Sequence, residues 1–366
     1  MKKRFYSISI TSPLRQSPPC RHRMMSVSLM MKRRAFCQTL AECLYSQVSH
    51  QRLIQTAGSH KMMKHALVTG GCGFIGTHLV HALRAMDVNV TVLDKQPPQT
   101  SQPLEGCTFV EADLLSRETV RECLQNVDTC FHLAAILNVV QCKRDWLFSH
   151  QNNVDGFNAV LNAIKSTGRP IKTVYASSCA VYGEITPLPL TEAMMPAPIS
   201  PYGADKLVNE IYAGMLAKCF GIPSIGLRFF NVYGPLQRDS SPYSGVIAAF
   251  RKNLLQGKPL TIYGDGEQLR DFVHVSDVVC ALIKAANTPP ALSGVFNVST
   301  GKTTSINQLA QYMMRRFNRE VPVVYEPPRA EDIRLSCGCP KKAQEILRFT
   351  PAIDIEQGLY TLDEHG

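Results

Sequence analysis

Thr69-Gly-Gly-Cys-Gly-Phe-Ile-Gly76 is the stretch of sequence that decides the fold. The short apolar run 65–69 before it is typical of a buried strand, and apolar residues recur at helical spacing over 74–86 after it. Glycines spaced in this way allow a tight turn at which the backbone approaches a pyrophosphate, while the free N–H groups of the helix N-terminus favour the anion. We therefore predict a dinucleotide phosphate loop formed by Gly70, Gly73, Phe74, Ile75 and Gly76.

The alternation of strand and helix continues beyond this first unit. Further strands are expected at 89–93, 107–110, 129–133, 172–176 and 224–228, with helices at about 116–125, 153–167 and 201–220. Apolar strands that alternate with helices predict an α/β fold, in which a Rossmann-type doubly wound parallel sheet is covered on both faces.

Asp94 ends the second strand, 18 residues after Gly76. A carboxylate at this place can bind a ribose 2′-hydroxyl and repels a 2′-phosphate, which favours NAD over NADP. The neighbouring Lys95 weakens this preference, because a cation tolerates the phosphate. Residues after the third and fourth strands are expected to contact the adenine and the cofactor where it crosses the sheet, namely Asp113, Leu114, Leu133, Ala134 and Ala135.

The domain organisation follows from the change of pattern after Arg228. Prolines and glycines become frequent there, and helices near 245–256, 276–287 and 305–317 are expected to be separated by loops and short strands. We predict an NAD-binding Rossmann core at 64–228 and a smaller, interleaved C-terminal substrate-binding lobe at 229–366. About 262–290 of that second part is expected to return to the core.

Tyr202 and Lys206 are the candidate chemical pair, because residues four apart share one face of a helix. A phenol ionises at about pH 10, and a nearby ammonium together with an oxidised nicotinamide would lower its pKa. Tyr202 could then act as a general base near neutrality. The pair alone is common on helix surfaces. It gains weight from Ser178, which follows the fifth strand and offers a hydroxyl to orient a substrate oxygen.

These motifs together resemble the NAD-dependent epimerase/dehydratase branch of the extended short-chain dehydrogenase/reductase superfamily, over roughly residues 64–362. The resemblance implies that Tyr202 is the base, that Lys206 binds the nicotinamide ribose and that Ser178 is the hydroxyl partner. It adds Asn153 and Phe229 to the cofactor site. It assigns the nucleotide sugar to Asn231, Val246, Tyr263, Arg270, Arg329 and Ser336, where the arginine forks suit phosphate oxygens.

Transient hydride transfer to bound NAD is the reaction that the resemblance implies. Tyr202 takes the proton of a sugar hydroxyl, the keto-sugar turns over in the pocket, and the hydride returns to its opposite face. The 4,6-dehydratases of the branch carry an acid pair just after the active-site hydroxyl, where this chain has Cys179-Ala180. That difference favours an isomerase, a UDP-sugar 4-epimerase. In the family's UDP-hexose 4-epimerases, a bulky residue at the place of Ser336 blocks an N-acetyl group. The small Ser336 therefore suggests, by this resemblance, UDP-N-acetylglucosamine as well as, or instead of, UDP-glucose.

Other activities remain open at this point. A UDP-glucuronate epimerase, a decarboxylase or a 4-keto-sugar reductase would share most of these motifs. A non-catalytic NAD-binding regulatory protein is a further alternative, although it has no need of Ser178, Tyr202 and Lys206. The family also implies a homodimer, and we expect a four-helix bundle formed by the apolar faces of the helices near 153–167 and 201–220.

The basic charge of the chain is confined to its first residues. The net charge is +10, but residues 1–65 hold twelve Lys and Arg and one acid, which leaves −1 for the rest. A nucleic-acid partner would need basic residues on the folded face, so none is expected. We interpret 1–63 as an extension that is disordered, a targeting segment or the product of a mis-assigned start upstream of Met62 or Met63.

The cysteine spacing and the hydropathy of the chain bear on metal binding, redox compartment and membrane association. The 13 cysteines are scattered without zinc-like spacing, which predicts no metal site and a reducing compartment. No run approaches the length of a membrane span, so no membrane partner is expected. The expected location is the cytoplasm, while the basic extension leaves organelle targeting open.

Overall fold

The computed structural model describes residues 63–97, 106–237, 245–329 and 332–362, which belong to one compact unit spanning 53–366. Apart from Met63, the predicted extension 1–63 lies outside the described residues. Among the described helices, none has the length and apolar character needed to cross a membrane.

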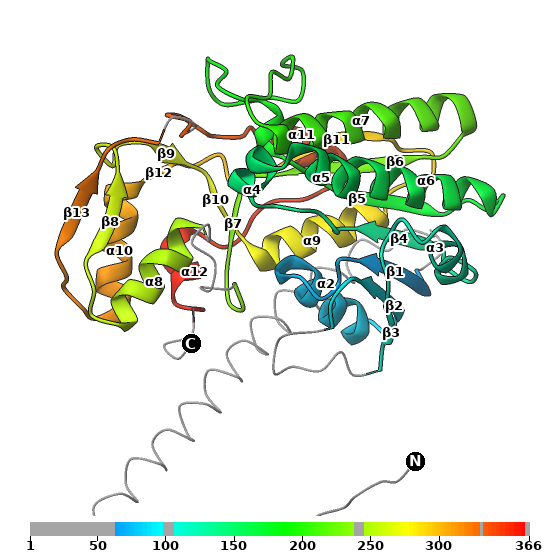
Figure 1. Ribbon diagram of the computed structural model, residues 1–366, viewed down its shortest axis with the longest axis horizontal. Coiled ribbons are helices and arrows are strands. Elements are labelled where there is room, and N and C mark those ends of the chain that lie inside the picture. Colours follow the sequence, from blue (N-terminus) through cyan, green and yellow to red (C-terminus); the bar gives the residue numbers. More distant parts are fainter. Residues whose placement is uncertain (1–62, 98–105, 238–244, 330–331, 363–366) are drawn as a thin grey trace, which may run out of the picture. The chain divides into compact units, whose positions relative to one another are not determined.

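The described chain forms a larger and a smaller lobe, and a seven-stranded parallel sheet lies at the centre of the larger one (Figure 1). The strands run in the order β11-β6-β5-β4-β1-β2-β3, so the chain reverses direction along the sheet after β3. The predicted doubly wound sheet is thereby confirmed. The strands are β1 (His65–Thr69), β2 (Asn89–Asp94), β3 (Thr108–Glu111), β4 (Thr129–His132), β5 (Lys172–Ser178), β6 (Ser224–Phe229) and β11 (Gly294–Val298).

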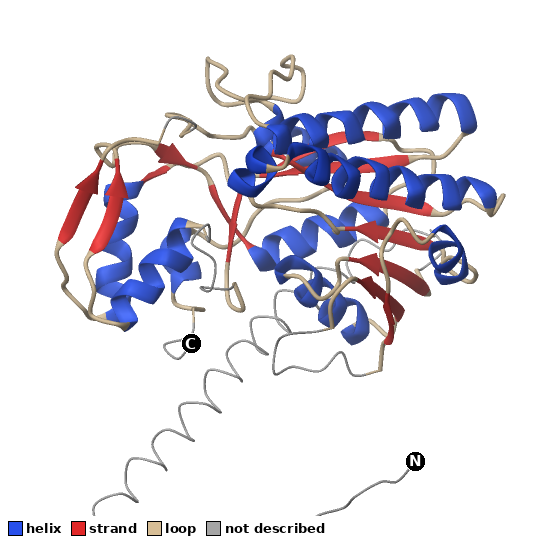
Figure 2. Ribbon diagram, viewed as in Figure 1, coloured by secondary structure: helices blue, strands red, loops and turns tan. Residues whose placement is uncertain are grey.

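Helices cover both faces of this sheet (Figure 2). One face carries α2 (Phe74–Ala85) and α9 (Val275–Ala286), which contact each other. The other carries α6 (Gly156–Ser166) and α7 (Pro201–Phe220), together with α3 (Arg117–Cys123), α4 (Val139–Arg144) and α5 (Trp146–His150). The short α11 (Lys341–Ile346) packs beside β11.

Helix α7 is well delimited by its sequence. The Ser200 side chain accepts a hydrogen bond from the Gly203 backbone, and Pro201 occupies the first helical position, where its missing N–H costs nothing. Gly221 ends the helix in the left-handed region at φ +65°. Ser200 and Pro201 thus fix the start of the helix one residue before Tyr202.

The smaller lobe packs around a second apolar core that includes Phe250, Leu309 and Met313. Its strands β8 (Leu260–Tyr263) and β13 (Val323–Glu326) pair in parallel. Its helices are α8 (Val246–Leu255), α10 (Ile306–Phe317) and α12 (Ile355–Leu359). Two short strand pairs complete the described fold: β7 (Asn231–Tyr233) with β10 (Phe272–His274), and β9 (Leu269–Arg270) with β12 (Thr304–Ser305).

The return of the chain to the core differs from the predicted 262–290. It comprises α9 and β11, which span 275–298, because β8 pairs with β13 in the smaller lobe instead. Strand β11 was missed, since its short apolar run is interrupted by polar Asn297. That side chain is fully buried, accepts a hydrogen bond from the Tyr182 hydroxyl and donates one to the Leu190 carbonyl.

The predicted intersubunit bundle needs a correction for α6. The apolar face of α6, with Phe157, Val160 and Ile164, is buried in the chain's own core and is not available to a partner. Helix α7, in contrast, leaves Ile211, Tyr212 and Met215 between 37% and 61% exposed. The homodimer stays a prediction, and α7 is the helix that could support it.

Candidate active site

The glycine loop joins β1 to α2 in a geometry that side chains would block. A Cβ on Gly76 would lie 2.2 Å from the Gly70 carbonyl oxygen, and one on Gly70, where φ is +70°, would lie 2.6 Å from the Ala134 nitrogen. Gly73 is the N-cap of α2 and provides no side chain to cap the first turn. Phe74 and Ile75 then begin the helix. The backbone at the N-terminus of α2 thus forms a cradle that suits the pyrophosphate of a dinucleotide.

Asp94 lies at the carboxyl end of β2, beside this loop. Its carboxylate accepts hydrogen bonds from the backbone of Cys72, at 3.0 Å, and of Gln96, at 3.2 Å. The neighbouring Lys95 ammonium is held by the Asp113 carboxylate at 2.8 Å and by the Asn152 amide oxygen at 2.5 Å. Because Lys95 already has these partners, its charge no longer argues for a 2′-phosphate, and the arrangement suits NAD.

The segment after β4 is fixed by Asn153. The Asn153 amide accepts a hydrogen bond from the backbone N–H of Ile136, at 2.7 Å, and donates one to its carbonyl, at 3.2 Å. Asn153 is fully buried within a single π-helical turn, Gln151–Asp155, an irregularity that is frequent at functional sites. Its side chain therefore shapes the loop that follows Leu133, Ala134 and Ala135, through which it could act on a cofactor.

Two of the predicted cofactor residues lie mainly in the packed interior. Leu114 is buried in the core cluster, where it packs against Gly156. Phe229 ends β6 and is 7% exposed. Leu114 and Phe229 could therefore contact a ligand only through their backbone and the exposed edges of their side chains.

Ser178, Tyr202 and Lys206 come together where β5 ends and α7 begins. The Ser178 hydroxyl accepts a hydrogen bond from the Ala180 backbone at 3.1 Å, and it lies beside the Tyr202 phenol, whose pKa it lowers. The Lys206 ammonium lies 5.8 Å from the centroid of the Tyr202 ring and donates to the Ala176 carbonyl at 2.9 Å. The structure thus brings the three predicted catalytic residues into one cluster.

The acidity of this cluster depends mainly on burial. Burial raises the pKa of the phenol above its ordinary value, and the hydrogen bond from Ser178 offsets this only in part. Burial also lowers the pKa of Lys206 to about 8, against the opposing effect of the Asp205 carboxylate. Desolvation is the largest effect on the phenol in the protein chain, and the lowering expected in the presence of an oxidised nicotinamide stays a prediction.

Two predicted substrate residues lie on the smaller lobe as a stacked pair. The Arg329 guanidinium lies 3.8 Å from the centroid of the Tyr263 ring. Arg270 is engaged by the Asp332 carboxylate, which also accepts a hydrogen bond from Gln268. Asn231 begins β7, and Val246 begins α8. A diphosphate would have to compete with Asp332 for Arg270, a relationship that the sequence did not reveal.

Ser336 lies next to the catalytic cluster, although it is 158 residues after Ser178 in the chain. Burial raises the pKa of the Cys179 thiol to about 11, and the side chains of both Ser336 and Ser178 lie close enough to the thiol to oppose this rise. Ser336 is 7% exposed, and its backbone N–H donates to the Leu269 carbonyl at 3.1 Å. One thiol therefore separates the residue predicted to sense substrate size from the residue predicted to orient the reacting oxygen. In the sequence, Cys179 drew attention only because it stands where the 4,6-dehydratases of the branch carry an acid.

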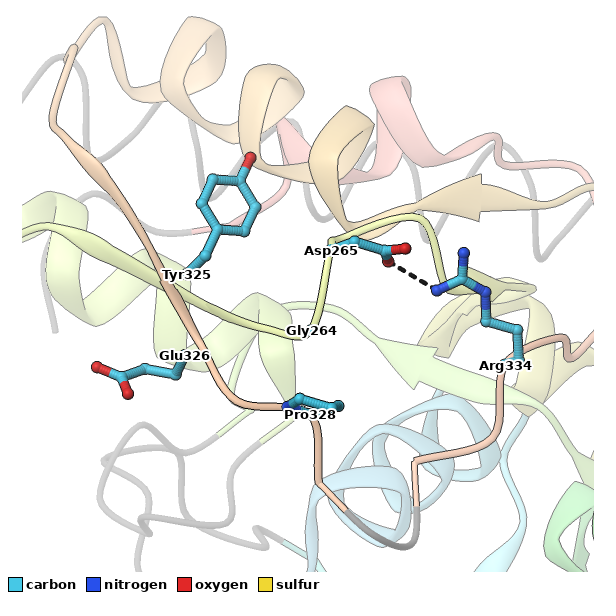
Figure 3. A pocket seen from close by; sticks show the side chains of 6 residues that line it. All are labelled: Gly264, Asp265, Tyr325, Glu326, Pro328 and Arg334. Carbon is cyan, nitrogen blue, oxygen red and sulfur yellow. Dashed lines mark hydrogen bonds and ion pairs between the residues drawn. The ribbon is translucent and has the colours of Figure 1, made fainter.

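The smaller lobe also has an open hollow of about 510 Å³ beyond β8 and β13 (Figure 3). An ion pair of 2.7 Å between Asp265 and Arg334 lies at its side. None of the predicted site residues lines it, although Tyr263 and Arg329 adjoin it in sequence. The catalytic cluster at the end of β5 is therefore the better candidate for the reacting centre. Within the described ranges, no group of three or more His, Cys, Asp or Glu side chains could hold a metal ion.

Comparison with known proteins gives a consistent result. The model of the NAD dependent epimerase/dehydratase family matches residues 66–299. A putative UDP-glucose 4-epimerase of Methanocaldococcus jannaschii is 34% identical over 296 residues, which cover 80% of this chain and 95% of that protein. A UDP-N-acetyl-alpha-D-glucosaminuronate decarboxylase of Bacillus cytotoxicus is 32% identical over 319 residues, or 81% and 96% of the two chains.

Among solved structures, the UDP-N-acetylglucosamine 4-epimerase of Methanobrevibacter ruminantium, in complex with UDP-N-acetylmuramic acid, is 35% identical. Its TM-score is 0.78, and the match covers 82% of this chain and 97% of that one. Fold, glycine loop and relatives agree on the cofactor, which is NAD. The chain therefore belongs to the NAD dependent epimerase/dehydratase family, as an enzyme of its UDP-sugar epimerase/dehydratase branch.

Proposed function

We propose that this protein is a UDP-sugar 4-epimerase that uses Tyr202 as its base. The observation that supports this proposal most strongly is the chemistry around Ser178. Its neighbours are the Tyr202 phenol and the Cys179 thiol, and no carboxylate within the described residues is bonded to Ser178 or Tyr202. A cluster without a neighbouring carboxylic acid suits proton removal and return at one sugar oxygen, whereas elimination of water calls for an additional general acid.

The role of each residue follows from this geometry. The Tyr202 oxygen takes the proton of the sugar hydroxyl, and the Ser178 hydroxyl, bonded to the same phenol, orients that hydroxyl. Bound NAD supplies the acceptor for the hydride and, while oxidised, a positive charge. Because burial raises the pKa of Tyr202, the phenol loses its proton readily only when further positive charge is present. After the keto-sugar has turned over, Tyr202 returns the proton to the same oxygen.

The similar proteins favour a second candidate function, that of a UDP-sugar decarboxylase. A decarboxylase that acts on a UDP-sugar acid is among the similar proteins, and it covers as much of this chain as the epimerases do. An epimerase returns both hydride and proton to the sugar, so its product has the mass of its substrate. A decarboxylase releases carbon dioxide.

Proton NMR of the anomeric region distinguishes these activities. The full chain is incubated separately with UDP-glucose, UDP-N-acetylglucosamine and UDP-glucuronate, without added NADH. We expect the corresponding galacto sugar from at least one of the first two. Loss of carbon dioxide from the third, with no turnover of the others, would establish the decarboxylase instead.

Substrate size should depend on Ser336, whose hydroxyl contacts Cys179. We expect Ser336→Tyr to lower kcat/KM for UDP-N-acetylglucosamine by roughly 100-fold, because a filled pocket excludes the acetyl group, and to change that for UDP-glucose by less than about 3-fold. Ser336→Cys, which keeps the small size, is the matched control. An equal loss with both sugars in the tyrosine variant would contradict this role for Ser336.

A further inference from the structure

Asp205 is a buried carboxylate between Tyr202 and Lys206 on α7. Its side chain is 6% exposed. One oxygen accepts hydrogen bonds from the Ser149 hydroxyl, at 2.8 Å, and from the Asn153 amide, at 3.3 Å. The other lies 3.0 Å from Nδ1 of His150, a residue whose side chain is 42% exposed.

These contacts connect α7 to the loop that follows β4. Asn153 bonds Asp205 with the same amide that holds the backbone of Ile136. Asn209, one turn beyond Asp205, donates to the Asn153 carbonyl at 2.9 Å. Asp205 is therefore the charged centre of a network that joins the catalytic helix, the π-helical turn and the segment after Ala135.

The charge of Asp205 acts on Lys206 as well. Desolvation disfavours the Lys206 ammonium, and the Asp205 carboxylate is the strongest influence that opposes it. Two other titratable groups face this pair. His132, on β4, is kept neutral by burial, which lowers its pKa to about 3, and burial raises the pKa of the Cys142 thiol on α4. Burial thus favours the uncharged form of both groups, which leaves Lys206 as the group of this set whose protonation the Asp205 charge promotes.

We propose that Asp205 is a positioning residue of the active site, which fixes Asn153 and the 133–136 loop to α7 and supplies the negative charge that faces Lys206. The inference rests on the proposed function and on the contact of Lys206 with the nicotinamide ribose that the family resemblance implies. Asp205 occupies one of the three positions of the Tyr-x-x-x-Lys pattern at which no residue type is specified, and the proposal gives this residue a role. If Asp205 acted only as a hydrogen-bond acceptor toward Ser149 and Asn153, the single amide oxygen of an Asn could replace it.

The test compares Asp205→Asn with Asp205→Glu and His150→Gln in the full chain. The first reading is the affinity for NAD, measured by titration calorimetry from pH 6 to 9. In the wild type this affinity should fall as pH rises through the pKa of Lys206, about 8, because the ammonium is lost. Removal of the Asp205 charge makes the ammonium less favourable and so moves this fall to lower pH, by about one pH unit.

We expect Asp205→Asn to bind NAD about tenfold more weakly at pH 7, since a charge-assisted network is lost. Asp205→Glu should restore the pH at which affinity falls, and His150→Gln should leave it unchanged, because both keep the carboxylate. The second reading, the pH profile of kcat with the sugar that the wild type accepts, should shift in the same direction. Asp205→Ser removes the same charge if the Asn variant does not fold.

An unchanged pH dependence of NAD affinity in Asp205→Asn or Asp205→Ser would overturn the proposal, even if both variants were less stable. A shift that also occurs in His150→Gln would assign the effect to the imidazole and would overturn it as well. If the wild type binds NAD but turns over no UDP-sugar, the proposed epimerase function fails, while the calorimetric comparison still decides the role of Asp205.

Discussion

Replacement of Tyr202 by Phe should reduce kcat by about 1000-fold and leave the affinity for NAD within a factor of about three. The phenol oxygen is the group that takes and returns the proton in the proposed reaction, and a positioned general base contributes roughly 100-fold to 10,000-fold. The ring itself remains, so its packing beside Lys206, 5.8 Å from the ring centroid, is kept. Anomeric NMR gives the turnover, and calorimetry gives the NAD affinity.

Tyr182 provides the matched control for this experiment. It is buried, and its hydroxyl donates to the Asn297 amide oxygen at 2.7 Å rather than to Ser178 or Tyr202. Tyr182→Phe should therefore lower stability by about 1–3 kcal/mol, the cost of a buried unsatisfied acceptor, with kcat nearly unchanged at 25 °C. A Tyr202→Phe variant that kept a tenth of the wild-type kcat would show that another group is the base.

Local signals in the sequence predicted much of this architecture. The six strands before residue 230 and the glycine loop depend on short apolar runs and on positions where a Cβ does not fit, so neighbouring residues carry the information. Strand β11 could not be found in this way, because its polar Asn297 is satisfied by partners more than 100 residues away. The edge of the sheet is thus completed by long-range contacts.

The sequence predicted which residues form the site better than it predicted their charges and pKa values. Tyr202 and Lys206 were found from their spacing and Ser178 from its place after a strand, but neither signal reports the burial that raises the pKa of the phenol. Asp205 was overlooked because its partners come from α5 and the π-helical turn, more than 50 residues earlier. The Asp332 carboxylate at Arg270 was missed for the same reason.

The buried pair of Glu210 and Arg228 leads to the largest expected effect on stability. Glu210, two turns after Tyr202 on α7, accepts hydrogen bonds from Arg228 at 2.9 and 2.7 Å and from the Ser177 hydroxyl at 2.5 Å. Both side chains are less than 10% exposed, so removal of one charge leaves the other buried without an opposite charge beside it. We expect Glu210→Gln to lower the free energy of unfolding by about 3–5 kcal/mol, measured by urea denaturation.

The control for this effect is an ion pair of the same kind on the surface. Lys341 and Glu345 lie 3.8 Å apart with side chains 75% and 62% exposed, so Glu345→Gln should change the free energy of unfolding by less than about 1 kcal/mol. The double variant Glu210→Met with Arg228→Met removes both buried charges and should recover part of the loss, because apolar side chains need no partner. A Glu210→Gln variant as stable as Glu345→Gln would mean that Arg228 finds another partner or water. In that case the seating of α7 against β5 and β6, and with it the placement of Tyr202 beside Ser178, would depend on apolar packing rather than on this pair.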